Sequence, residues 1–339
     1  WSTEPGAASP TFQNDAGLAA RVQMTLVADA ATVWRIEVSA AAQDAAANYR
    51  ISMGPVHTAT DADRQRANAE RALASAEALR REAATPGVAH DTAARDAKQA
   101  VVEYEQALRL ARAAEDDCLQ MMAHADLARL QYATADYSKA VQSAHAALHY
   151  RCGADADASA AAERGVAERT LGSALGYTGD LIDGTAAQER ALALYRQTGD
   201  AHFQAMALGN LSADYRVLGE THKALNAAQG ALRLAEAGGD KGRALFVRES
   251  IAAIHLQRGE LALARDGYMQ TVADLRGTPD PMLAGMAWND LGLLYRELGD
   301  DDQSLQAYRS AEIAWKASGN SDGLTETRVN EAEAALDRD

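Results

Sequence analysis

The residues best suited to nucleophilic chemistry are two cysteines, Cys118 and Cys152, and His149, which lies one helical turn before the second cysteine. A catalytic cysteine needs a histidine within hydrogen-bonding reach and an electropositive setting that stabilises the thiolate. Both cysteines instead fall at predicted helix ends among core residues, which does not favour a catalytic pair. The three side chains also lack the fourth ligand of a structural zinc site.

A disulfide is the stronger interpretation of the two cysteines. Cys118 opens the first helix of a predicted hairpin and Cys152 closes the second, and the turn near Ala135 is 17 residues from each. Antiparallel helices of equal length bring those ends together, and a bridge there contributes about 4 kcal/mol in the chain-entropy model. A bridge indicates an oxidising compartment such as the periplasm, and therefore an exported protein. The alternative is two buried reduced thiols in a cytoplasmic protein.

Other signals for catalysis are absent from the sequence. No glycine-rich phosphate loop follows a strand pattern, and neither HExxH nor CxxC occurs. The carboxylate runs at 115–117 and 300–302 precede predicted helices, where negative charge stabilises the helix N-terminus. We therefore predict that the chain is not an enzyme and uses no cofactor or metal.

Composition narrows the class of protein further. The 339 residues are 47% hydrophobic, rich in alanine and only 5% aromatic, and six are proline. Alanine has the best intrinsic helix propensity, so the composition favours helix over most of the chain. A net charge of −15 repels nucleic acid and anionic lipid. No apolar run reaches the ~20 residues that span a bilayer, so we expect neither nucleic-acid binding nor membrane insertion.

The helical patterns repeat every 40 residues. Helix-ending glycines, block-closing polar residues and apolar anchors recur at this spacing, at Gly179, Gly219, Gly259 and Gly299, at Asp200, Asp240, Asp280 and Asn320, and at Leu171, Leu211, Ile251 and Leu291. Each period holds two helical stripes, as in 281–298 and 305–315, and Gly299 is expected to turn left-handed between them. A hairpin of this kind cannot bury both of its faces alone. The repeat therefore predicts a solenoid of stacked helix hairpins.

One period carries residues of a known repeat signature. Trp288, Leu291, Gly292, Tyr295, Gly299, Ser304, Tyr308 and Ala311 stand in the order of the tetratricopeptide (TPR) motif. The chain resembles the long-helix TPR subtype over about 118–320, in five blocks. The resemblance implies antiparallel helix hairpins in a right-handed superhelix. It also implies that Trp288, Tyr295, Tyr215 and Tyr268 pack between helices.

The resemblance also implies where a partner binds. In TPR solenoids the first helix of each pair lines a concave groove. The groove positions here are occupied by Arg129, Tyr132, Arg169, Tyr177, Asn210, Arg216, Glu249, Asn289, Arg296 and Glu297. Asparagine can both donate to and accept from a peptide backbone, and arginine binds carboxylates in a two-pronged fashion. The arginines suggest an acidic peptide ligand. The alternative is a solvated inner face whose charges pair within the chain.

The segments that flank the array differ from it. Residues 57–116 predict an atypical helical hairpin that turns at Pro86-Gly87, 117–320 the TPR array, and 321–339 a capping helix. Residues 1–56 alternate apolar and polar side chains, which predicts a partial β-sandwich-like segment. A β segment that runs into TPR repeats resembles the N-terminal region of bacterial CHAT-type proteins, which often continue into a caspase-like peptidase.

Three functions follow as expectations. The first is a non-catalytic scaffold that binds a peptide or partner domain in the TPR groove. The second is the regulatory and substrate-docking arm of a CHAT-type peptidase whose catalytic domain lies downstream. The third is a small-ligand sensor.

Overall fold

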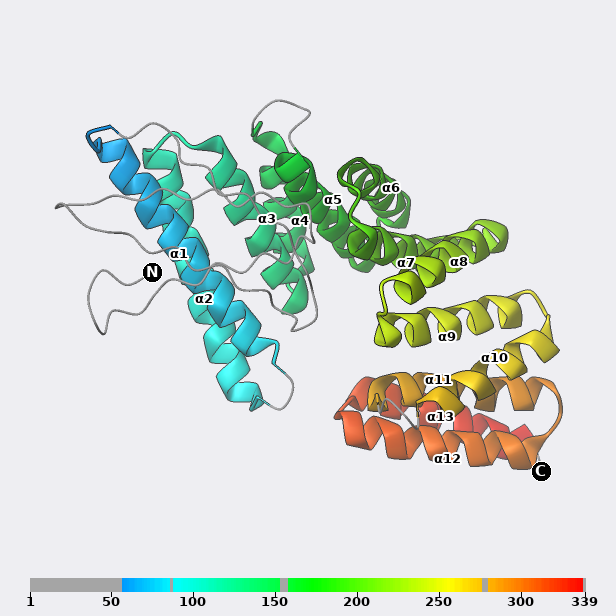
Figure 1. Cartoon of the computed structure of the whole chain (residues 1–339). Helices are drawn as coiled ribbons and strands as arrows, with labels where there is room; N and C mark the ends of the chain where they lie inside the picture. The colour runs from blue at the N-terminus through cyan, green and yellow to red at the C-terminus, as the bar shows by residue number, and fades with distance from the viewer. Residues whose placement is uncertain (1–56, 86–87, 153–157, 276–279, 338–339) are drawn as a thin grey trace. The chain divides into compact units, whose positions relative to one another are not determined.

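The computed structural model describes residues 57–85, 88–152, 158–275 and 280–337 (Figure 1). The β segment predicted for residues 1–56 lies outside the described residues. Within them the secondary structure is entirely helical. The helices are α1 (Asp61–Ala83), α2 (His90–Ala113), α3 (Asp117–Ala133), α4 (Tyr137–His149), α5 (Ala158–Thr178), α6 (Leu181–Thr198), α7 (Ala201–Val217), α8 (Thr221–Ala237), α9 (Lys241–Gln257), α10 (Leu261–Asp274), α11 (Pro281–Glu297), α12 (Asp301–Ser318) and α13 (Ser321–Asp337).

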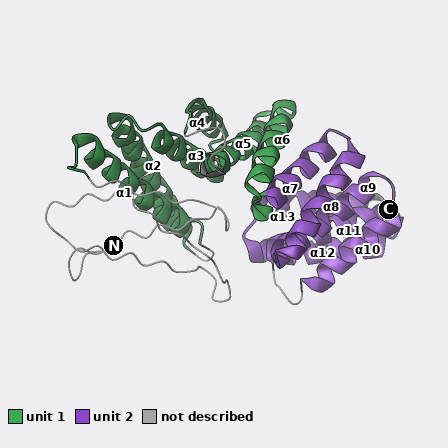
Figure 2. Cartoon of the chain, turned by 45° about the horizontal axis from the view of Figure 1, so that its top comes forward, with its two compact units in different colours: residues 1–203 green, residues 204–339 purple. Residues whose placement is uncertain are grey.

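The chain divides into two compact units, residues 1–203 and 204–339 (Figure 2). The boundary falls just inside α7, so α1–α6 belong to unit 1 and α8–α13 to unit 2. In both units consecutive helices pair as hairpins, and the first helices of successive hairpins also contact one another, α1 with α3, α3 with α5, α9 with α11, and α11 with α13. We call the surface of these first helices the first-helix face of each unit.

A glycine–aspartate pair sets the ends of the helices. Gly299 follows α11 with φ of 73°, as predicted, and the backbone N–H of Asp300 bonds to the Tyr295 carbonyl five residues back. Asp300 then caps α12, since its Oδ1 accepts from the Gln303 N–H at 3.1 Å. The block-closing residues cap the first helices in the same way, with Oδ1 of Asp200, Asp240, Asp280 and Asn320 accepting at 2.9–3.0 Å from the N–H three residues on. Most of the 40-residue period is thus written in helix stops and starts.

Small residues let the helices of unit 1 approach closely. The ring of Tyr104 is fully buried between α1 and α2 among alanines that are themselves inaccessible to solvent, Ala69, Ala76, Ala100, Ala107 and Ala111. Alanine methyls leave room for one large ring while keeping the backbones near each other. The high alanine content of the chain therefore serves packing as well as helix propensity.

In unit 2, glycine and large rings are paired across each hairpin. A Cβ on Gly292 of α11 would overlap the ring of Tyr308 of α12, and the Ser304 hydroxyl donates to the Gly292 carbonyl at 2.9 Å. Tyr268 and Tyr295 are buried, and Trp288 packs at the edge of the same cluster. Tyr215 packs partly buried on the cluster around α8 and α9. The prediction that these aromatic residues are packing residues is confirmed.

Candidate functional site

The predicted groove residues Tyr132 and Tyr177 come together in unit 1. They close the first helices α3 and α5, and their ring centroids lie 5.9 Å apart in an edge-on arrangement. Tyr137, the first residue of α4, joins them. Its ring stacks on Tyr177 at 4.3 Å with an interplanar angle of 7° and lies 5.6 Å from Tyr132. We call these three residues the tyrosine cluster.

The tyrosine cluster is anchored on one side and open on the other. Tyr132 and Tyr137 are partly buried, whereas 65% of Tyr177 is exposed. Burial and the neighbouring phenols Tyr177 and Tyr137 raise the pKa of Tyr132 to about 12, and the positive charge of Arg169 opposes this. All three side chains are therefore neutral at physiological pH. They present ring faces and hydroxyl groups rather than charge.

Arg129, a third predicted groove residue, is bound within unit 1. Its guanidinium contacts Glu77 at 3.2 Å and Asp126 at 3.0 Å. Although burial opposes it, the hydrogen bond from Arg80 and the charges of Arg129 and Arg80 lower the pKa of Glu77 to about 2. The Tyr104 hydroxyl also donates to Glu77, at 3.2 Å. This network joins α1, α2 and α3, which matches the alternative expectation of internal pairing at this position.

Arg169 of α5 lies between two phenols. Its charge lowers the pKa of Tyr132 and of Tyr195, although burial raises the pKa of Tyr195 to about 12 overall. Nearby Glu163 also faces this interior, because burial and the negative charge of Asp126 raise its pKa to about 8. The first-helix face of unit 1 thus passes from a charged network on α1 and α3 to an aromatic cluster at the ends of α3 and α5.

In unit 2, α13 occupies two of the predicted groove residues. Arg296 of α11 donates to Glu333 of α13 at 2.8 Å. Asn289, only 6% exposed, accepts from the Thr327 hydroxyl at 2.9 Å and from the Asn330 amide at 3.1 Å. Both side chains therefore hold helices of the array together in this structure.

The remaining predicted residues of unit 2 lie on α7. Arg216 is exposed, and its charge acts on two carboxyl groups of the neighbouring first helices, Glu249 of α9 and Asp290 of α11. Asn210 is partly buried and takes part in an interaction within the protein. The structure thus gathers the predicted residues into two separate groups, one in each unit.

The two cysteines are joined. The Sγ atoms of Cys118 and Cys152 are 1.97 Å apart and the Cα atoms 4.6 Å apart, which links the start of α3 to the segment after α4. His124 lies in the same hairpin and stacks on Tyr150, with ring centroids 5.8 Å apart.

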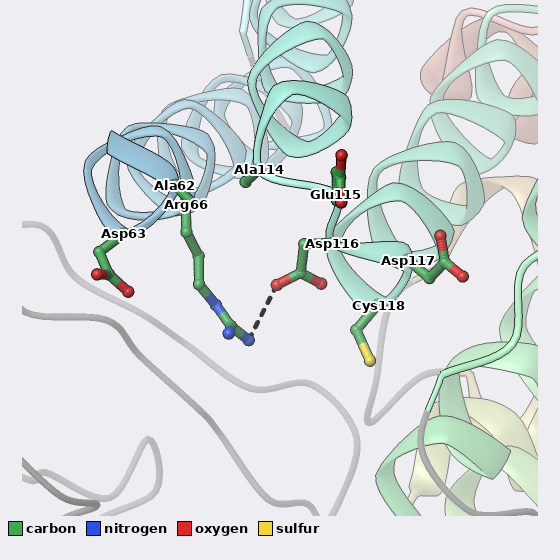
Figure 3. Close-up of a pocket in the computed structure, with 8 residues that line it drawn as sticks. All are labelled: Ala62, Asp63, Arg66, Ala114, Glu115, Asp116, Asp117 and Cys118. Carbon is green, nitrogen blue, oxygen red and sulfur yellow. Dashed lines mark ion pairs between the residues drawn. The ribbon is translucent and has the colours of Figure 1, made fainter. Parts of the chain in front are cut away.

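A hollow of about 310 Å³ lies beside the start of α3 and includes Cys118 (Figure 3). Asp63, Glu115, Asp116 and Asp117 line it, and Arg66 reaches from α1 to bind Asp116 at 3.0 Å. Asp116 also caps α3 by accepting from the Leu119 N–H at 3.0 Å. These charged groups are thus committed to helix capping and to pairing α1 with α3.

Two broader searches covered the described part of the chain. No group of three or more His, Cys, Asp or Glu side chains is placed there to hold a metal ion. Likewise, none of the helices there has both the length and the apolar character that a membrane crossing requires.

No protein-family model matches the sequence, and no curated protein matches it. Solved structures do. The apo form of RapI has 12% identity and a TM-score of 0.57, over 81% of this chain and 86% of that one. The apo form of the quorum sensor NprR from B. thuringiensis has 13% identity and a TM-score of 0.53, over 72% and 69%. A Rap protein complexed with Competence and Sporulation Factor has 13% identity and a TM-score of 0.50, over 78% and 76%.

The fold is that of a TPR-like helical-repeat protein. At such low identities the likeness concerns the fold alone. Of the cluster residues, the repeat template picked out Tyr132 and Tyr177 but missed Tyr137, which opens a second helix. The sequence signal for it was proximity, since Tyr137 lies just across the Ala135 turn from Tyr132.

Proposed function

We propose that the chain is a non-catalytic interaction scaffold that binds a peptide or partner domain at the tyrosine cluster of unit 1. The observation that carries this proposal is the stacked, 65% exposed ring of Tyr177, held in place by Tyr132 and Tyr137. Tyrosine supplies a large amphipathic contact area at low entropic cost, because the side chain has only two rotatable angles. Here the supporting rings lower that cost further.

The contacts of the arginines bear on the chemistry of the partner. The expectation of an acidic peptide rested on four arginines, of which Arg129 and Arg296 are ion-paired within their own units. A neutral aromatic surface selects by shape and apolar contact more than by charge. We therefore infer that the partner presents an apolar or aromatic side chain to Tyr177, and that acidic residues in it play a secondary part.

The structural neighbours support a ligand-binding role of this kind. NprR is a quorum sensor, and one Rap structure contains Competence and Sporulation Factor. Both proteins share the TPR-like fold with this chain. A signalling molecule is accordingly a candidate ligand.

A display library of random linear peptides, selected against the full chain, tests the proposal. We expect the selected peptides to bind the wild-type chain and to lose about tenfold or more in affinity for Tyr177→Ala, as is typical of a buried aromatic anchor. Val102→Ala is the matched control, because Val102 of α2 is also half-exposed and lies outside the cluster. Circular dichroism checks that both variants keep their helicity. Equal affinity for Tyr177→Ala and the wild type would rule out the tyrosine cluster as the site.

The resemblance of 15–320 to the N-terminal and TPR region of CHAT-type proteins supports a second proposal. In it, the same surface docks substrates or regulators for a caspase-like peptidase domain. Sequencing the gene downstream of residue 339 tests this, since a domain with a histidine–cysteine pair is expected there. A different downstream sequence would leave the scaffold proposal standing by itself.

A further inference from the structure

Two carboxyl groups meet between successive repeats of unit 2. Glu249 projects from α9 and is only 3% exposed, and Asp290 projects from α11. The two side chains are hydrogen-bonded to each other. Two carboxylates cannot form such a bond, because both would only accept. The contact therefore requires one proton between them.

The groups around the pair fix where that proton lies. The Tyr268 hydroxyl of α10 donates to Asp290 Oδ2 at 3.0 Å, and the Asn289 amide lies 3.5 Å from Asp290 Oδ1. These donors favour the ionised form of Asp290, so Glu249 is the protonated partner and donates to it. Ser250, next in sequence, also bonds to Glu249.

Arg216 of α7 is the cation that acts on the pair, and it is exposed to solvent. The protonated pair carries one negative charge, which Arg216 balances. Without the proton the pair carries two negative charges between packed helices, and one of them has no counter-charge. Like charges at hydrogen-bonding distance in a buried setting repel strongly.

We propose that the Glu249–Asp290 contact is a proton-operated link between successive repeats of unit 2. With the proton bound, the contact holds α9 against α11. When the proton leaves to solvent, the two carboxylates repel and this part of the first-helix face opens. The link lies outside the tyrosine cluster, so it does not rest on the proposed binding function.

The pH range follows from the chemistry of the pair. Burial, together with the negative charge of Asp290, raises the pKa of Glu249 to about 8 from its ordinary value of 4.5. A carboxyl group whose pKa is raised on folding adds stability that is complete below its unfolded pKa. That contribution is lost as the pH rises through the folded pKa. The link is therefore engaged at neutral pH and released under mildly alkaline conditions.

Hydrogen–deuterium exchange of the full chain tests the link locally. Protection of 241–257 and 281–297 is compared at about pH 7 and about pH 9, after correction for the intrinsic exchange rate. We expect wild-type protection in both segments to fall about tenfold or more at the higher pH. Glu249→Gln should show no such fall, because the glutamine amide still donates to Asp290 and cannot ionise.

Two further variants make the result decisive. Asp290→Asn leaves a single ionisable group in the pair and is expected to remove most of the pH dependence. Glu297→Gln removes an exposed carboxylate from the same helix and should behave as the wild type. The proposal is overturned if wild-type protection does not change with pH, or if it falls equally in Glu249→Gln. A uniform loss of protection in a variant at both pH values does not affect this comparison.

Discussion

At the scale of single residues, most buried charge in this protein is compensated, and the exceptions are informative. Glu77 accepts hydrogen bonds from Arg80, Arg81 and Tyr104, so its ionised form is stabilised despite burial. Asp214 of α7 differs. Its Oδ2 is buried without a hydrogen-bond partner, and burial alone raises its pKa to about 6.

The repeat shows what Asp214 replaces. The positions one period away are buried and apolar, namely Ala174, Ile254, Leu294 and Ala334. Asp214→Leu is therefore expected to raise the free energy of unfolding by about 1–2 kcal/mol at pH 8, after allowance for the partial exposure of the site. Because the folded pKa is raised, the wild-type residue adds stability below its unfolded pKa of 3.8 and loses it as the pH rises through about 6. The gain should accordingly be smaller near pH 4.

Urea unfolding of the wild type, Asp214→Leu and Asp214→Asn at both pH values measures this gain. The asparagine variant removes the charge but not the polarity, so it separates the two contributions. A gain that does not vary with pH would show that ionisation of Asp214 is not the cause of the cost.

At the scale of the elements, the helix ends carry most of the information in the sequence. Left-handed residues follow α5, α7, α9 and α11, and all are glycines. After α3 the same position is Ala135, with φ of 60°, and it makes the same pair of hydrogen bonds, with the Asp136 N–H bonded to the Gln131 carbonyl. The turn is thus specified by its surroundings even where the residue is unfavourable.

Ala135→Gly is expected to stabilise unit 1 by about 0.5–1 kcal/mol, because the relief of the left-handed Cβ strain exceeds the added entropy of the unfolded chain. Ala133→Gly, two residues earlier and within α3, should destabilise the protein by a similar amount. Thermal unfolding of the two variants checks the pair. A lower melting temperature for Ala135→Gly would contradict the assignment of strain.

The Cys118–Cys152 bridge closes a separation of 34 residues around the α3–α4 hairpin. We expect the intact mass of the non-reduced protein to be lower by two hydrogens than that of the reduced protein. Reduction should lower the free energy of unfolding by about 4 kcal/mol. A variant with Cys118→Ser and Cys152→Ser should be insensitive to reductant. Thiol labelling of both cysteines in the non-reduced wild-type protein would exclude the bridge.

At the scale of the whole molecule, the repeat predicted the fold because period, helix ends and packing residues all agree. Gly292 and Tyr308, for example, are readable as a close helix crossing from spacing alone. The candidate site was only partly predictable. A template gives the face on which Arg129 or Asn289 stands, but their partners Glu77 and Thr327 lie 52 and 38 residues away, so the sequence did not show that the groove charges are already paired.

The account rests on the claim that the tyrosine cluster binds a partner. Hydrogen–deuterium exchange of the full chain, with and without a peptide selected from the display library, tests it most directly. The account predicts that the peptide protects the C-terminal turns of α3 and α5 and the first turn of α4, and that Tyr177→Ala abolishes this protection. Protection confined to α2 or α6, with the ends of α3 and α5 unchanged, would contradict it.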